Sequence, residues 1–321
     1  MAEFDLLVLG DVNPDLVLRG GDVVPAFAQA ERIVEEARLT IGGSGAILAC
    51  GAARLGLRVA IAGVVGDDLF GRFMLDELAA RGVDTRGVVV DHTRSTGVTV
   101  VLSRLDDRAM LTAAGTIGDL RASLVDPALI GSARHVHVSA FFLQLGLAAG
   151  LPEIFDEAHR AGATTSIDPN WDPAGAWDGG LLDLLSDVDV FLPNAMEAMR
   201  LARISDLDEA IVRLRARVPL VVVKNGAHGA IASRPGELVR GPGFDVRIVD
   251  TTGSGDSFDA GFLAGFLEGD TLERCLALGN ACGALSTLVP GGTDGQPTMA
   301  EATAAIEGRS ARAGREGGSD S

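Results

Sequence analysis

The chain has 321 residues, 47% of them hydrophobic, and a formal net charge of −17 at pH 7. This length and composition allow a large buried core, whereas the acidic balance excludes the clustered basic surface that nucleic-acid binding needs. No apolar run reaches the length of a membrane span, and the first residues lack the basic region of a signal peptide. Three cysteines without metal-type spacing are expected to be free thiols, which favours a cytoplasmic protein. From the charge and the apolar runs we expect no nucleic-acid or membrane partner.

Short apolar runs that are typical of buried strands recur along the chain and alternate with helical patterns. The predicted strands are Leu6–Gly10, Val59–Val65, His135–Ser139, Thr164–Asp168, Val188–Leu192 and Leu220–Lys224. The predicted helices are Ala46–Leu55, Leu69–Arg81, Leu147–Arg160, Asp208–Arg217, Asp256–Leu267, Leu272–Asn280, Ala281–Leu288 and Met299–Glu307. Continuous apolar strands that alternate with helices predict a mostly parallel central sheet covered on both faces.

Two segments, Val12–Ile41 and Arg94–Thr112, break the alternation, because they carry β-like runs without an intervening helix. The second is expected to be a hairpin that turns at Leu105-Asp106-Asp107. Together they predict a small antiparallel sheet that covers a ligand or pairs with a second copy. We therefore divide the chain into an α/β domain (residues 1–11, 42–93 and 113–307), a β-sheet lid (12–41 and 94–112) and a disordered tail from 308 to 321.

Polar residues follow the first predicted strand, where open α/β sheets bind their ligands. Asn13 and Asp15 offer an amide and a carboxylate that suit the hydroxyl groups of a polyol, although an Asx-Pro turn is an alternative explanation. Gly42 and Gly43 then lead into the next helix. These glycines either let a substrate approach the backbone or serve a turn that needs positive φ.

Two later strand ends carry polar residues that suit a nucleotide. Asn194 and Glu197 lie three residues apart at a helix start, where they favour a hydrated Mg²⁺ beside phosphates. The same spacing fits a capping box, and the two roles can coexist. Lys224 is the only lysine of the chain and is expected to reach phosphate oxygens, with Gly226 and Gly229 at the nucleotide edge. Asp168 and Asn170 are second candidates for the phosphate side.

The segment Asp250–Gly261 follows a β-like run, Phe244–Val249, and opens a helix. Backbone amides of such a glycine turn form an anion site at the helix N-terminus. Asp256 lies inside that site, and its ionised form suits a general base beside a phosphate that is being transferred. The alternative is that Asp256 merely caps a glycine-rich helix start.

In this order the motifs resemble the ribokinase-like (PfkB) carbohydrate kinases over residues 4 to about 307. The strongest markers are Gly42–Ala46 and Asp250–Asp256. The resemblance implies a three-layer α/β/α domain with a β-sheet lid, and transfer of the γ-phosphate of ATP to a sugar hydroxyl with Mg²⁺. It also implies a small-molecule sugar acceptor, and we expect a homodimer that forms through the lid.

The resemblance assigns each candidate residue a role. The base is Asp256, and the anion hole comprises Gly253, Ser254 and Gly255. The acceptor residues are Asn13, Asp15, Gly42 and Gly43. The nucleotide residues are Asn194, Glu197, Lys224, Gly226, Gly229 and Asn280, with Glu197 reaching Mg²⁺ through water. A loosely matching monovalent-cation site, for K⁺, comprises Asp250 and Thr252 with the Ser286–Thr293 loop.

The chain departs from the family pattern at the acceptor pocket. Ile47 stands where many of these sugar kinases have an asparagine, and a ribokinase-type glutamate after the strand His135–Ser139 is absent. Phe141 and Phe142 lie nearby and keep a nucleoside acceptor open, since aromatic rings stack on bases. A non-catalytic sugar sensor is the alternative from another class, and the presence of Asp256 argues against it. A dinucleotide-dependent oxidoreductase fails on the missing glycine fingerprint.

Overall fold

The main body of the computed structural model, which describes residues 2–21, 23–28, 30–104 and 107–316, is built on a nine-stranded sheet. The strands lie in the order β13 (Glu237–Gly241), β12 (Ala230–Arg234), β11 (Leu220–Lys224), β10 (Val190–Phe191), β9 (Thr164–Ile167), β8 (His135–Val138), β1 (Leu6–Leu9), β4 (Val59–Gly66) and β5 (Val83–Asp91). The strands from β11 to β5 are parallel, and β12 and β13 form an antiparallel edge. The predicted mostly parallel sheet is confirmed.

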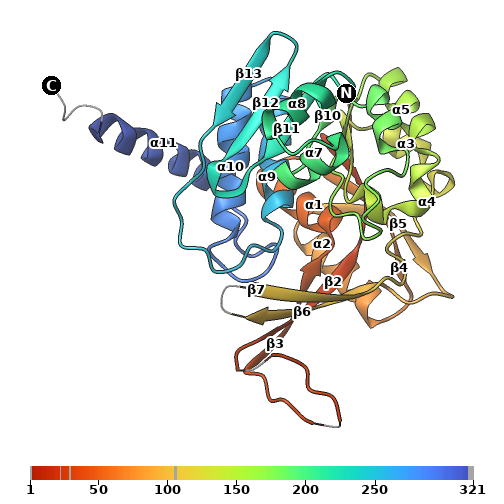
Figure 1. Cartoon of the computed structure of the whole chain (residues 1–321). Helices are drawn as coiled ribbons and strands as arrows, with labels where there is room; N and C mark the ends of the chain where they lie inside the picture. Colours follow the sequence, from red (N-terminus) through yellow and green to blue (C-terminus); the bar gives the residue numbers. More distant parts are fainter. Residues whose placement is uncertain (1, 22, 29, 105–106, 317–321) are drawn as a thin grey trace.

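Helices cover both faces of this sheet (Figure 1). One face carries α3 (Pro127–Gly131), α4 (Leu145–Ala148), α5 (Leu151–Arg160), α6 (Leu181–Leu184), α7 (Ala195–Ala202) and α8 (Leu207–Arg215). The other face carries α1 (Ser44–Arg54), α2 (Leu69–Ala80), α9 (Ser254–Glu268), α10 (Leu272–Ser286) and α11 (Met299–Glu316). Short 3₁₀ turns are η1 (Ala122–Leu124), η2 (Phe141–Leu143), η3 (Leu185–Asp187) and η4 (Gly226–His228). None of the helices in the described ranges is long and apolar enough to cross a membrane.

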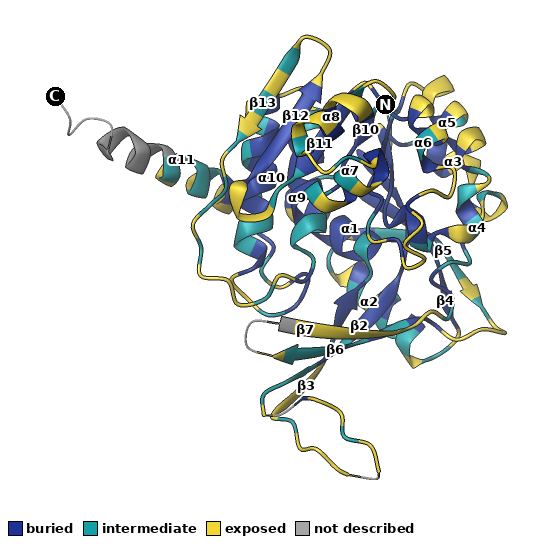
Figure 2. Ribbon diagram, viewed as in Figure 1, coloured by how far each residue is buried: buried dark blue, intermediate teal, exposed yellow. Residues whose placement is uncertain are grey.

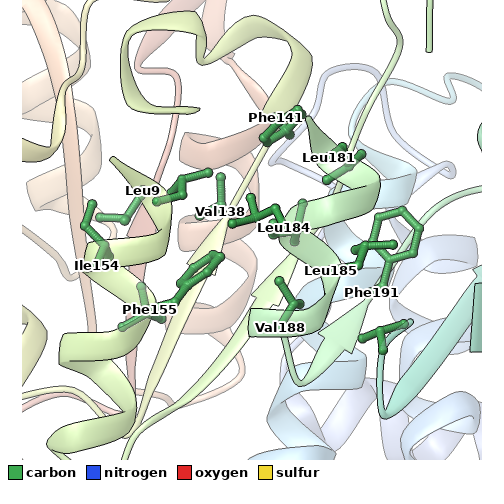
Figure 3. Packing of buried hydrophobic residues seen from close by; sticks show 14 of the residues in the cluster. Leu9, Val138, Phe141, Ile154, Phe155, Leu181, Leu184, Leu185, Val188 and Phe191 are labelled. Carbon is green, nitrogen blue, oxygen red and sulfur yellow. The ribbon is translucent and has the colours of Figure 1, made fainter. Parts of the chain in front are cut away.

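Two hydrophobic clusters, one on each face, hold the three layers together. Figure 3 shows part of the first cluster, in which Phe155 of α5 and Leu184 of α6 pack with Val138 of the central strand β8. Colouring by burial shows the central strands buried while the outward faces of the covering helices are exposed (Figure 2). Because the sheet is buried on both faces, its strands consist of continuous apolar runs, which made them visible in the sequence.

A second sheet of four strands lies below the main body in Figure 1. Its order is β3 (Glu36–Gly42), β2 (Asn13–Arg19), β6 (Val98–Arg104) and β7 (Asp107–Ala113). The outer pairs are antiparallel, but β2 and β6 run parallel, so the prediction of a purely antiparallel sheet was wrong. The two strands are parallel because each starts at the main body, after β1 and β5 respectively, and runs outward. The predicted turn residues Leu105 and Asp106 lie outside the described residues.

Several element boundaries differ from the predictions. Helix α10 is continuous where two helices were expected, whereas Gly150 and Pro152 separate α4 from α5 within one predicted helix. Phe244–Val249 is not a strand, because its residues face the cavity described below and none of the described strands pairs with it. Helix α11 continues to Glu316 where a disordered tail was expected from Gly308, and residues 317–321 lie outside the described range.

Candidate functional site

A cavity of about 1120 Å³ lies at the carboxyl ends of the parallel strands, between the main sheet and the four-stranded sheet. Its wall brings together nearly all the predicted site residues, from segments far apart in the chain. These are Asn13, Asp15, Gly43, Asn194, Glu197, Lys224, Gly226, Gly229, Thr252, Gly253, Ser254, Gly255, Asp256 and Asn280. Gly42 and Asp250 lie behind this wall.

The glycine turn before α9 presents the start of that helix to the cavity. Gly253 adopts the left-handed conformation (φ 69°), and the first helical turn contains Asp256. None of the described side chains caps this N-terminus, which leaves the partial positive charge of the helix directed at the cavity. A helix N-terminus in this arrangement can bind an anion beside the Asp256 carboxyl group.

Burial, together with the nearby carboxylates of Asp168 and Asp11, raises the pKa of Asp256 to about 8. The ammonium of Lys224 and a hydrogen bond with Ser44 act in the opposite direction. A carboxyl group whose pKa lies near the working pH can both accept a proton and release it, as a general base must.

The first residues of β2 form part of the cavity wall. Asn13 and Asp15 are 2% and 7% exposed, and Asn13 Oδ1 has no hydrogen-bond partner among the described residues. Burial and the charge of Asp11 raise the pKa of Asp15 to about 7. A buried, unpartnered amide oxygen beside a buried carboxyl group is costly without a polar ligand, so this arrangement fits a polyhydroxylated one.

Asp11 has a role that the sequence did not reveal. Its carboxylate accepts hydrogen bonds from the backbone N–H groups of Ser44 (3.1 Å) and Gly45 (2.9 Å) and thereby holds the N-terminus of α1 against β1. Ser44 in turn accepts a hydrogen bond from the side chain of Asn170 (2.9 Å). These bonds fix one side of the pocket around Asp256.

The four-stranded sheet contributes wall residues that sequence reasoning missed, from β6 and β7: Thr99, Arg108, Met110 and Thr112. Arg108, Met110 and Thr112 alternate along one strand and therefore share a face. That period of two was the available signal. Arg108 reaches the main domain, where Nη1 donates to Thr252 Oγ1 (2.9 Å) and lies 3.5 Å from Asp250 Oδ1.

Elsewhere in the cavity wall, Asn194 and Glu197 form a complete capping box at the start of α7. The Asn194 side chain accepts from the N–H of Glu197 (3.0 Å), while Glu197 accepts from the backbone and side-chain N–H groups of Asn194 (2.7 and 2.6 Å). Burial raises the pKa of Glu197 to about 7. Each carboxylate oxygen keeps a lone pair for a water molecule, so the capping role leaves a water-mediated metal contact possible.

Lys224 and Asn280 are engaged within the protein. Lys224 Nζ lies between Asp168 (2.9 Å) and Asp259 (2.9 and 3.1 Å), and Asn280 donates to the carbonyl oxygens of Gly241 and Pro242. Phe141 and Phe142 pack in the first hydrophobic cluster instead of lining the cavity, so they do not serve as a stacking surface for a base. Ile47 does line the cavity.

Three comparisons give this geometry a context. A family model described as pfkB family carbohydrate kinase matches residues 4–299. An ATP-dependent ribose-1-phosphate kinase from Halopiger xanaduensis is 35% identical over 290 residues, which cover 88% of this chain and 91% of that protein. An E. coli protein described as a ribokinase II, solved with ATP and Mg²⁺, is 26% identical with a TM-score of 0.85 and covers 95% of this chain and 99% of its own. An adenosine kinase from Sinorhizobium meliloti is 25% identical with a TM-score of 0.83, covering 96% and 100%.

A parallel α/β sheet, a small second sheet and a carboxylate at a helix N-terminus define a phosphotransferase of the ribokinase fold. The chain belongs to the pfkB family of carbohydrate kinases. It is an ATP-dependent kinase whose acceptor is a hydroxyl group of a sugar or sugar derivative.

Proposed function

We propose that Asp256 is the general base and that the amides of Gly253, Ser254 and Gly255 hold the transferred phosphoryl group. The observation that carries the proposal is the position of Asp256 in the first turn of α9, in the same cavity wall as Asn13 and Asp15. The acceptor O–H proton passes to Asp256, its oxygen bonds to the γ-phosphorus of ATP, and the bond from that phosphorus to the β-phosphate oxygen breaks to release ADP. The helix N-terminus stabilises the charge on the phosphoryl oxygens.

The donor side comprises Asn194, Glu197, Gly226, Gly229 and Asn280, which line the opposite part of the same cavity. No cluster of three metal-binding side chains is found in the described part of the chain, which fits Mg²⁺, an ion that keeps several waters and few protein ligands. Glu197 would hold it through water. When bound, Mg²⁺ neutralises charge on the phosphates of ATP.

For the acceptor we propose an anionic sugar derivative, with ribose 1-phosphate as the first compound to test. Arg108 lines the cavity together with the polar Thr99 and Thr112, and its charge acts on Asp15. Ile47 also lines the cavity, and unlike the asparagine of many of these sugar kinases it offers a neutral sugar no amide group. The name of the Halopiger relative supports the same class.

A coupled ATP-consumption assay over ribose, ribose 1-phosphate, sugar acids and nucleosides tests this proposal. Asp15→Ala should raise the acceptor KM, because loss of a charge-assisted hydrogen bond costs roughly 1.5–3 kcal/mol, while ATP binding persists. Arg108→Met should raise KM for the anionic acceptor more than for neutral ribose. Turnover that prefers ribose and ignores the change at Arg108 would reject the anionic class.

A nucleoside acceptor is the second candidate, because Trp171 is 50% exposed and lines the cavity. An exposed indole face can stack on a base. The structural likeness to an adenosine kinase supports this alternative. Trp171→Ala would lower nucleoside turnover and leave sugar turnover intact if it holds.

The contacts of Asp250 and Thr252 do not favour the K⁺ site that was predicted there. The Asp250 carboxylate accepts from the N–H and hydroxyl of Thr252 and from Gly291 N, and the guanidinium of Arg108 already supplies a positive charge beside it. We assign no step to K⁺. Assays in K⁺, Na⁺ and a large organic cation decide whether the enzyme depends on it.

We also propose that residues 12–41 and 94–112 act as a lid and join two subunits in a homodimer. Exposed apolar residues on these segments support pairing, notably Phe27 (93% exposed), Ile33 (80%) and Leu111 (60%). Light scattering at micromolar concentration tests the dimer, and a monomer would reject it. Three buried free cysteines support a cytoplasmic location.

A further inference from the structure

The ammonium group of Lys224 contacts the side chains of two acidic residues, Asp168 and Asp259. Its side chain is 12% exposed, and Nζ donates to Asp168 Oδ2 at 2.9 Å and to the two oxygens of Asp259 at 2.9 and 3.1 Å. Asp259 is completely buried. An ammonium group has three N–H donors, and these three contacts use them all. The ammonium of Lys224 is thus engaged by Asp168 and Asp259, although its position in the sequence had suggested a phosphate contact.

The presence of lysine rather than arginine at this position fits these contacts. Lys224 is the only lysine in a chain whose 27 basic residues are otherwise arginine. A guanidinium is a planar fork, whereas an ammonium is a compact point charge that fits between converging carboxylates. An ammonium therefore suits this buried position between two carboxyl groups better than a guanidinium.

This charge lies beside the glycine turn that precedes Asp256. A β-carbon at Gly255 would be 3.9 Å from Lys224 Nζ, and Gly255 immediately precedes Asp256. Asp259 stands one turn further along the same helix, α9, while Asp168 follows β9 and Lys224 ends β11. The cluster thus ties the first turn of α9 to two strands of the main sheet.

We propose that Lys224 is a positioning residue: its ammonium, fixed by Asp168 and Asp259 beside the glycine turn, holds the first turn of α9 in place and favours the ionised form of the Asp256 carboxylate. The inference rests on the proposed role of Asp256 as the base. Lys224 was expected to contact phosphate. In this proposal it acts instead on Asp256, through contacts within the protein.

The groups that face Asp256 come from four elements. Asp11 follows β1, Ser44 begins α1, Asp168 follows β9 and Lys224 ends β11. Burial, Asp168 and Asp11 raise the pKa of Asp256, whereas Lys224 and Ser44 lower it. Burial also raises the pKa of Asp259 well above its usual value, whereas the ammonium of Lys224 opposes burial at Asp168, whose pKa is lowered. Removal of Lys224 and removal of Asp168 should then move the pKa of Asp256 in opposite directions.

The test needs no acceptor. The wild type and each variant below are compared with the same protein carrying Asp256→Asn in addition, by melting temperature across pH. The pH at which the increase in melting temperature caused by Asp256→Asn levels off reports the proton affinity of Asp256. Relative to the wild-type background, Lys224→Gln should move that pH upward by about one unit and Asp168→Asn should move it downward by a similar amount. Arg160→Gln, which removes an exposed cation paired with Asp156, is the control and should move nothing.

Shifts in the same direction, or no shift for Lys224→Gln, would overturn the proposal. If Lys224→Gln does not fold, Lys224→Arg keeps the charge but displaces it, and a smaller upward shift is required. With a turning-over acceptor, Lys224→Gln should lower kcat about tenfold or more while KM for ATP stays within about threefold. A raised KM for ATP with unchanged kcat would mean that Lys224 binds phosphate. Full activity of Asp256→Asn would instead reject the proposed base, whatever the melting curves show.

Discussion

Gly42 and Asp15 approach each other so closely across the β2–β3 pair that a β-carbon at residue 42 would lie 2.0 Å from Oδ1 of Asp15. Gly42 does not have a positive φ, so space rather than backbone conformation demands a glycine. Gly42 was predicted to contact the acceptor. In the structure it also leaves room for the carboxylate of Asp15, which faces the cavity.

Gly42→Ala should therefore act through Asp15. The added methyl group forces the carboxylate out of place, and the acceptor KM should rise about tenfold or more while KM for ATP stays unchanged. Gly131→Ala is the matched control, because a β-carbon there meets nothing within 4 Å. An unchanged acceptor KM in Gly42→Ala, alongside a raised one in Asp15→Ala, would show that the carboxylate tolerates displacement.

Replacement of the base should separate chemistry from binding. Asp256→Asn keeps the shape of the side chain but cannot take a proton, so kcat should fall by about two to four decades with little change in KM. Steady-state kinetics with the best acceptor measure this. A variant that keeps more than about half of the activity would rule out Asp256 as the base.

The same substitution should stabilise the fold in a pH-dependent way. The pKa of Asp256 is raised to about 8 in the folded protein, above its ordinary value of 3.8, so its neutral form supports folding and its charged form opposes it. This stability is complete below pH 3.8 and is lost as the pH rises through 8. Asparagine imitates the neutral form at every pH. The gain in melting temperature from Asp256→Asn should thus grow with pH and level off above about 8.

The exposed Asp76→Asn is the control for that measurement, and its effect on melting temperature should not grow over the same range. An equal gain for Asp256→Asn at acidic and alkaline pH would mean that the carboxyl group is not destabilised by its surroundings when charged.

Residues at strand ends were predictable because local sequence determines them. Asp256 follows a glycine turn, and Asn194 with Glu197 has the spacing of a capping box, which the structure contains. Each of these signals lies within a few residues, and the parallel sheet then brings the strand ends together.

Contacts between distant segments were not predictable in the same way. The sequence around Lys224 does not predict its ion pair with Asp259, because that pair depends on how α9 packs against β11. The wall contributed by Arg108 depends on the register of β7 and on the parallel pairing of β2 with β6, which was expected to be antiparallel. Phe244–Val249 has a β-like composition, yet it faces the cavity without a partner strand.

Acceptor binding should rigidify the four-stranded sheet more than ATP does. Thr99, Arg108 and Thr112 line the acceptor side of the cavity, whereas the nucleotide side is built from the main domain, so only the acceptor bridges the two sheets. Closure matters because water admitted to the site would hydrolyse ATP instead of letting its phosphate reach the sugar. Amide hydrogen exchange in Thr96–Ser103 should slow on addition of the true acceptor and change less with ATP alone. The buried strand His135–Val138 is the internal reference, since its exchange should not respond to either ligand. Equal protection by ATP alone would refute the lid, and so would an acceptor that binds without slowing these amides.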